Sequence, residues 1–201
     1  MKKLLALMLL FTTVTAFAGI DYGLEKGQTR AGIYGGMSVP QDWSIDGVNV
    51  APGDTGFIFG GEIIHNITPM FGLGLDLGYA SYGSKTTLGV LDMNASVFSI
   101  SAVGRVNFMP QSQGRIYIPF GVGLSHLSST IAETTPGLTQ NGTDSQSGPS
   151  FLAGLGFEFD LNPEWTLGIE GRYFYMPVDD NKFGDSKFSS INILLKLGVR
   201  F

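Results

Sequence analysis

Apolar and polar residues alternate along the last eleven residues of the chain. Every odd position from Ile191 to Phe201 is apolar, while the even positions are polar or glycine except for Leu194. A period of two over this length predicts a β-strand with one apolar face and one polar face. About ten residues tilted by roughly 45° suffice to cross the hydrocarbon core of a bilayer. We therefore predict a membrane-spanning strand that closes a barrel.

Seven further segments repeat this alternation. Each places large aliphatic or aromatic residues at alternate positions, with mostly Gly, Ser, Ala or a charged residue between them. The predicted strands span residues 29–39, 56–66, 71–82, 94–108, 115–127, 150–161, 165–176 and 191–201. Eight is an even number, as bacterial transmembrane barrels require.

The connections between these segments alternate in length. Three are tight turns containing Pro, Gly or Asn, and four are longer polar stretches at residues 40–55, 83–93, 128–149 and 178–189. This arrangement predicts an all-β fold, an eight-stranded antiparallel up-and-down transmembrane β-barrel whose short turns and Phe201 face the periplasm. The third long connection is rich in Ser, Thr, Gly and Gln, so we expect a mobile loop there.

A soluble barrel of the lipocalin type would also alternate, but with its apolar face inside. The polar face decides between the two barrels. It is dominated by Gly, Ser and Ala with a few isolated charges, whereas a strand surface facing water should be rich in Lys and Glu. Small residues and sparse charges suit a narrow lumen, so we favour the membrane barrel.

The N-terminus has the pattern of an export signal. Lys2 and Lys3 precede a short apolar core, and Ala16-Phe17-Ala18 forms a cleavage site. We expect residues 1–18 to be a cleaved signal peptide and residues 19–201 to be the barrel, located in the outer membrane of a Gram-negative cell. The chain has no Cys and a net charge of −5, which excludes thiolate metal sites and argues against nucleic-acid binding.

Charged residues of both signs fall on the predicted inward face, five acids and five bases. They are Glu62, Asp76, Glu158, Asp160, Glu170, Arg30, Arg105, Arg172, Lys196 and Arg200. A selective pore would carry one sign, but a balanced set can neutralise itself in an interior that is only wide enough for side chains. We therefore predict a plugged lumen in which Glu170 and Lys196 make a cross-strand contact at similar depth.

Two segments resemble a known family. Tyr117 to Ser125, with the sequence YIPFGVGLS, and Leu167 to Tyr173, with the sequence LGIEGRY, are similar to strands of small OmpA-like and OmpX/Ail-like barrels. Val199-Arg200-Phe201 resembles their terminal insertion signal, although Val199 stands where an aromatic residue is common. The resemblance implies outer-membrane lipid, lipopolysaccharide and the barrel-assembly machinery as partners, and an extracellular ligand bound by the loops. It implies surface interaction or envelope integrity, or alternatively a small-solute or ion pore.

An enzymatic alternative rests on His126 and Ser128, which lie two residues apart and hence on one side of a strand. The pair resembles a motif of lipid A 3-O-deacylases, with Glu133 as the nearest group to orient the base. That motif continues with Asn-Ala, where this chain has Ser129-Thr130. A rim histidine in the headgroup zone is the simpler interpretation. The acidic residues of 179–185 match no calcium loop, and we predict a non-enzymatic protein without cofactor or metal.

Overall fold

The computed structural model describes residues 23–45, 48–50, 55–82, 91–135, 138–180 and 184–201. At the extracellular strand ends only the backbone is described. The predicted signal peptide, residues 1–18, and the middle of the acidic segment 179–185 lie outside these ranges.

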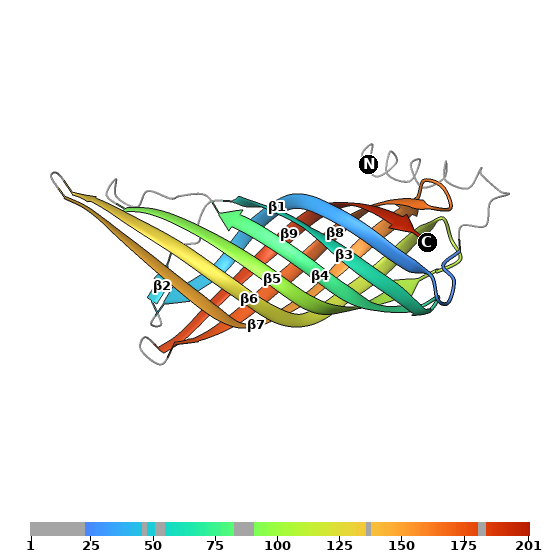
Figure 1. The fold of residues 1–201 in the computed structure, drawn as a ribbon, viewed down its shortest axis with the longest axis horizontal. Coiled ribbons are helices and arrows are strands. Elements are labelled where there is room, and N and C mark those ends of the chain that lie inside the picture. Colours follow the sequence, from blue (N-terminus) through green and yellow to red (C-terminus); the bar gives the residue numbers. More distant parts are fainter. Residues whose placement is uncertain (1–22, 46–47, 51–54, 83–90, 136–137, 181–183) are drawn as a thin grey trace, which may run out of the picture.

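Nine strands among the described residues form one antiparallel sheet. They are β1 (Thr29–Ile45), β2 (Val48–Val50), β3 (Gly56–Thr68), β4 (Phe71–Tyr82), β5 (Leu91–Phe108), β6 (Gly114–Thr135), β7 (Leu138–Asp160), β8 (Trp165–Asp180) and β9 (Gly184–Arg200). Each long strand pairs with its neighbours in the chain, and β1 pairs with β9 to close the sheet. The short β2 only adds a hairpin to β1. The predicted eight-stranded up-and-down barrel is confirmed (Figure 1).

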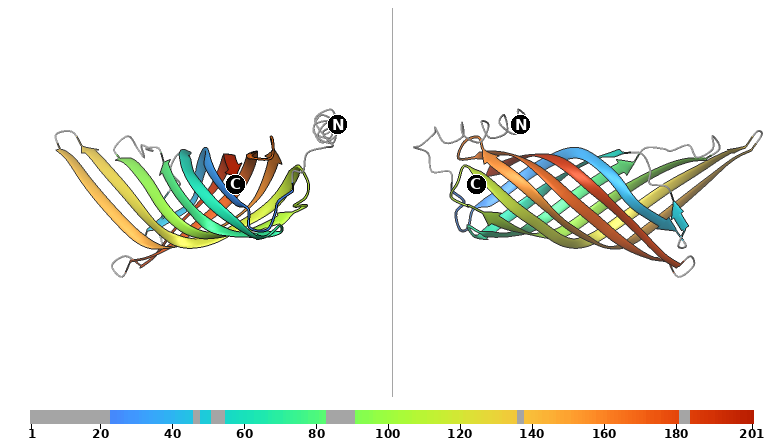
Figure 2. Two further views of the ribbon diagram at one scale, coloured as in Figure 1. Left: turned by 45° about the vertical axis from the view of Figure 1, so that its right-hand side comes forward. Right: turned by 180° about the vertical axis from the view of Figure 1, so that it is seen from behind.

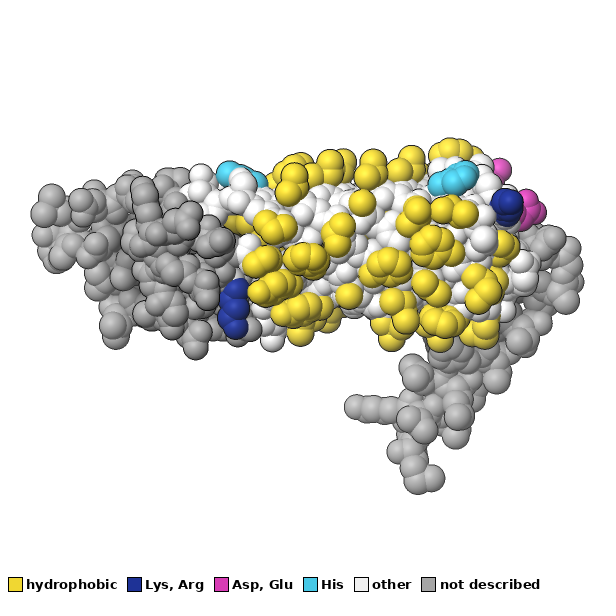
Figure 3. Space-filling view, turned by 90° about the horizontal axis from the view of Figure 1, so that it is seen from below, with side chains coloured by type: hydrophobic (Ala, Val, Ile, Leu, Met, Phe, Trp, Pro, Cys, Tyr) yellow, Lys and Arg dark blue, Asp and Glu magenta, His cyan; other side chains and the backbone are white. Residues whose placement is uncertain are grey.

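The apolar face of each strand points outward. Ile33, Leu124 and Leu195 are 66%, 67% and 61% exposed, and most other large outward side chains are similarly accessible. Figure 3 shows these side chains as a broad apolar belt, with the visible charged residues only at its two ends. An exposed apolar surface of this extent marks a membrane or partner interface. No described helix has the length and apolarity needed to cross a membrane.

The strands reach further at the extracellular end than the sequence pattern predicts. The prediction of a loop at residues 128–149 is wrong. In this segment β6 and β7 pair without interruption, from the pair Ser128 and Ser145 to the pair Thr135 and Leu138. Where neither face of a strand is buried, the alternation that reveals it disappears. Thr nevertheless suits strands through its branched Cβ, so backbone pairing persists without the pattern.

The segment before β1 crosses the periplasmic end of the barrel. The Leu24 N–H donates to the Pro110 carbonyl at 2.9 Å, and the Gly27 N–H donates to the Asn66 carbonyl at 2.7 Å. Gln111 Nε2 also donates to the Leu24 carbonyl, at 3.3 Å. The Leu24 side chain is buried. The segment therefore spans from β3 to the β5–β6 turn and covers part of the periplasmic mouth.

Candidate functional sites in the lumen and the extracellular sheet

All five predicted acids and all five predicted bases lie on the inward face, and their side chains are buried. Together with Arg115, described below, they form one connected set of ion pairs. Lys196 lies at its centre, with Nζ 2.7 Å from Glu62 Oε2 and 2.8 Å from Glu170 Oε2. Arg172 extends the set of ion pairs, since it contacts Glu170 at 2.7 Å and Asp76 at 3.1 Å. Because each buried charge has a partner of opposite sign, the ion pairs offset part of the desolvation cost of their members.

The same set extends towards the periplasmic end. Arg30 joins Glu62, at 2.7 Å, to Glu158, which also accepts from Arg105 at 3.1 Å. Arg200 pairs with Asp160 at 2.8 Å. The structure thus brings every predicted lumen charge into contact with at least one other.

The pair Glu170 and Lys196 meets diagonally. In the strand register Lys196 lies opposite Gly168, and Glu170 lies opposite Leu194. The two side chains are therefore offset by two residues, and the length of the lysine closes the gap. Their depths agree to within one strand repeat, as the sequence argument expected.

Sequence reasoning missed Arg115, although the signal was present. It lies two residues before Tyr117, which is on the inward face, and so shares its direction. Arg115 is fully buried, with Nη2 2.9 Å from Glu158 Oε1 and Nη1 2.7 Å from Asp160 Oδ2. The described lumen therefore contains six bases and five acids.

Two tyrosines contact the buried ion pairs of the lumen. The Tyr117 hydroxyl donates to Glu170 Oε2 at 2.9 Å, and the Arg105 guanidinium carbon lies 3.5 Å from the centre of the Tyr117 ring. The ring also lies directly on Gly156, where a Cβ would collide with it. Tyr34 donates to Asp76 Oδ1 at 3.0 Å. Glycine on the inward face therefore makes room for the rings that hold the carboxylates in place.

The extracellular half of the described lumen is largely apolar, with a few buried Ser and Asn side chains among the apolar ones, and the sequence argument did not predict this. Leu194, Met176 and Phe188 are at most 1% exposed there, and the Tyr82 and Phe188 rings pack with centroids 5.3 Å apart. This position explains why Leu194 departs from the alternation of the last strand. The lumen thus has a charged layer near the periplasm and an apolar layer above it.

These layers and the segment over the periplasmic mouth lead to a prediction on conductance. We expect purified protein in planar bilayers to give no steady channel current, because the side chains that project into the described lumen are buried against one another. Single-channel recording checks this, with buffer containing the same detergent as the control. Stable openings in every insertion event would contradict a plugged lumen.

His126 and Ser128 lie at the extracellular rim. His126 is exposed, and its Nδ1 lies 2.8 Å from Ser147 Oγ on the neighbouring strand. Glu133 lies seven residues further along β6, about 23 Å at the rise of an extended strand, and its side chain is outside the described ones. Among the described side chains no carboxylate, the third group that a nucleophilic site needs, orients the imidazole.

Above the apolar belt the barrel wall divides. The β7–β8 pairing begins only at Phe151 and Tyr175, so residues 138–150 of β7 pair with β6 alone. β8 continues beside β9 to Asp180. The β6–β7 hairpin and the β8–β9 hairpin therefore diverge, as both views of Figure 2 show. β5, β6 and the extended part of β7 form a protruding sheet, which we call the extracellular sheet.

The residues of the proposed insertion signal end the β1–β9 seam. Val199 pairs with Ala31 on one side and Trp165 on the other. Phe201 is 72% exposed, and its N–H donates to the Thr29 carbonyl at 2.9 Å. Both residues are thus available at the rim, and their recognition during insertion stays a prediction.

Comparison with known proteins agrees with this architecture. The family model described as outer membrane protein beta-barrel domain matches residues 4–201. The attachment invasion locus protein Ail of Yersinia pestis is 17% identical, with 88% of this chain and 99% of that chain covered and a TM-score of 0.58. A second structure of that protein holds the heparin analogue sucrose octasulfate.

Two other solved structures share the fold. Neisserial surface protein A is 17% identical over 88% of this chain and 100% of that chain, with a TM-score of 0.56. OprG of Pseudomonas aeruginosa is 15% identical over 91% and 99%, with a TM-score of 0.51. No curated protein sequence matches the chain. The match to the family model over nearly its whole length shows that the chain belongs to the outer membrane protein beta-barrel domain family and resides in the outer membrane.

Proposed function

We propose that this protein is a non-enzymatic surface-binding protein, and that the free edge of β7 in its extracellular sheet captures an extended segment of a partner protein. The observation that carries the proposal is the strand pairing. From Leu138 to Ser145 the strand register pairs the β7 backbone with β6 and not with β8. An unpaired edge presents a row of N–H and C=O groups that another strand can complete.

The length of this edge suits such a partner. Near Gly148 the β8 backbone is still close, since a Cβ there would lie 3.1 Å from the Pro177 carbonyl. We take the accessible edge from Ser145, further along β7, to Leu138, which is eight residues, about 26 Å of extended chain. Backbone pairing would supply affinity, and side chains that alternate along the edge would supply selectivity.

Charge narrows the class of partner. The four stretches 40–55, 83–93, 128–149 and 178–189 together contain nine acidic residues and three lysines. This acidic surface favours a basic segment by electrostatic steering. It disfavours sulfated polysaccharides, in contrast to the heparin analogue bound by the Yersinia protein.

The test shortens the β6–β7 hairpin. Because Thr130 and Thr143 are cross-strand partners, residues 131–142 can be replaced by an Asn-Gly turn that closes a regular hairpin. Refolded barrels would be assayed on immobilised fibronectin, laminin, collagen and heparin. We expect salt-sensitive binding to at least one protein and none to heparin, with the protein binding lost in the shortened variant.

A charge variant provides the matched control. Glu133→Gln with Asp144→Asn keeps the edge and removes two acids, so binding should weaken but persist. Binding unchanged in the shortened variant, or binding to heparin alone, would refute capture by the β7 edge.

The enzymatic alternative is tested separately. Expression of the protein in a Gram-negative host should leave the mass of lipid A unchanged, because His126 contacts Ser147 and lacks an orienting carboxylate among the described side chains. Mass spectrometry of extracted lipid A gives the readout, with Ser128→Ala alongside. Loss of one acyl group that depends on Ser128 would establish a hydrolase instead.

A further inference from the structure

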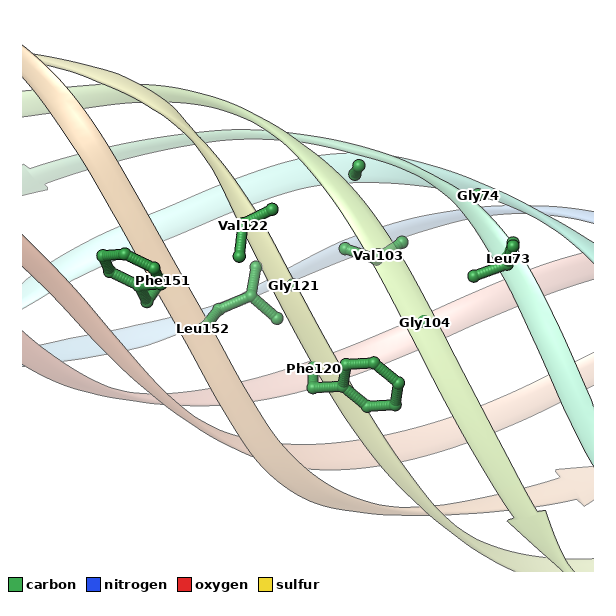
Figure 4. A pocket seen from close by; sticks show the side chains of 10 residues that line it. Leu73, Gly74, Val103, Gly104, Phe120, Gly121, Val122, Phe151 and Leu152 are labelled. Atoms are coloured by element: carbon green, nitrogen blue, oxygen red, sulfur yellow. The ribbon is translucent and has the colours of Figure 1, made fainter.

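The lipid-facing belt contains an apolar groove of about 600 Å³ that runs across β4, β5, β6 and β7. Its walls are Leu73, Phe120, Val122 and Phe151, which are between 42% and 58% exposed. Figure 4 shows these side chains around the groove, with the Phe120 ring reaching from β6 towards Gly104 on β5. Apart from backbone, the lining carries only carbon.

The groove exists because β5 presents two small residues outward where its neighbours present large ones. Gly104 lies between Leu73 and Phe120 in the strand register, and Ala102 lies beside Val122. The Phe120 ring packs onto Gly104 so closely that a Cβ there would collide with it. Drawn to that side, the ring leaves the outward surface at Ala102 open as the floor of the groove.

The groove is continuous with the surface that the outer-membrane barrel presents to lipid. Within hydrocarbon a void forfeits the dispersion contacts of the atoms that line it, so an occupant of matching shape is favoured over an empty groove. The volume corresponds to about twenty groups the size of a water molecule or methylene. That suits one acyl chain and is too small for an α-helix of roughly 10 Å diameter.

We propose that this groove binds one acyl chain of a membrane phospholipid, which exchanges more slowly than the lipid around the rest of the barrel. A phospholipid is favoured over lipopolysaccharide because the groove reaches the periplasmic end of the belt, where Leu73 lies two residues from the start of β4, whereas lipopolysaccharide lies in the outward leaflet. A second copy of the chain is disfavoured because its convex barrel wall cannot fill a recess between strands. The acyl chain is thus recognised by shape alone.

The test enlarges the side chain of Ala102 at the floor of the groove. Protein reconstituted in vesicles of phosphatidylethanolamine, phosphatidylglycerol and lipopolysaccharide would be extracted in mild detergent and analysed by native mass spectrometry. We expect wild type to retain one phospholipid. Ala102→Phe should lower the retained fraction by about fivefold, a modest change in binding free energy, and the smaller Ala102→Val should lower it partially.

Ala31→Phe is the matched control, since Ala31 is also outward but lies on β1, beside Val199 of β9. It should retain lipid as wild type does. Heat-dependent gel mobility identifies the folded fraction, to which the comparison is restricted. Equal retention in Ala102→Phe and wild type, retained lipopolysaccharide in place of phospholipid, or a second protein chain as the retained partner would each overturn the proposal.

Discussion

Replacing Lys196 by Met should lower the free energy of unfolding by about 3–5 kcal/mol, the usual effect of removing one partner of a buried ion pair. Lys196 is 7% exposed and holds both Glu62 and Glu170. Its loss leaves two carboxylates with less compensation in a lumen closed by an apolar layer. Urea titration of the barrel in lipid vesicles, followed by tryptophan fluorescence, measures the change.

The double variant Lys196→Met with Glu170→Gln should recover part of this loss. The amide that replaces the Glu170 carboxylate can still accept a hydrogen bond from Arg172, and it removes one uncompensated charge, while Glu62 keeps its contact with Arg30. Lys26→Met, at an exposed lysine outside the barrel, serves as the control and should change little. If Lys196→Met costs no more than about 0.5 kcal/mol, as exposed pairs do, the charged layer is wetter than its geometry implies.

The sequence predicted the barrel well because its lipid-facing surface imposes a strict period of two. The lipid-facing belt excludes polar side chains along its whole height. Each strand therefore carries the same alternating pattern, whichever side chains fill the lumen. The extracellular sheet faces no such constraint, and its alternation is accordingly absent. Only strand pairing reveals that residues 128–135 extend β6.

The lumen was predicted less completely, because its side chains pack against and pair with one another. The lipid-facing side chains, in contrast, all meet the same apolar environment. Charges could be assigned to the inward face by parity, and Arg115 was within reach of the same argument. The apolar layer was not, because Leu194 and Phe188 are inward residues that interrupt the expected polar face. Whether such interruptions lie together depends on the register between strands, which a single sequence does not reveal.

Register also governs how the barrel closes, and two adjacent glycines on β1 should respond very differently to substitution. Gly36 lies opposite Leu194 at the β1–β9 seam, where a Cβ would collide with the backbone of Ile193. Gly35 faces outward, and its nearest neighbour, the Ile58 carbonyl, would be 3.8 Å from a Cβ. The clash at Gly36 involves backbone, so it cannot be relieved by rotating a side chain.

Gly36→Ala should therefore reduce the assembled fraction by about tenfold or more, equivalent to ~1.4 kcal/mol, whereas Gly35→Ala should assemble as wild type does. The measurement is the proportion of unboiled protein that migrates as the compact barrel after refolding into lipid vesicles. The two variants make the same chemical change one residue apart, so intrinsic strand propensity cancels between them. Equal assembly of both variants would mean that β9 shifts to admit a methyl group. The distance between the paired backbones of β1 and β9 would then be larger than in this structure.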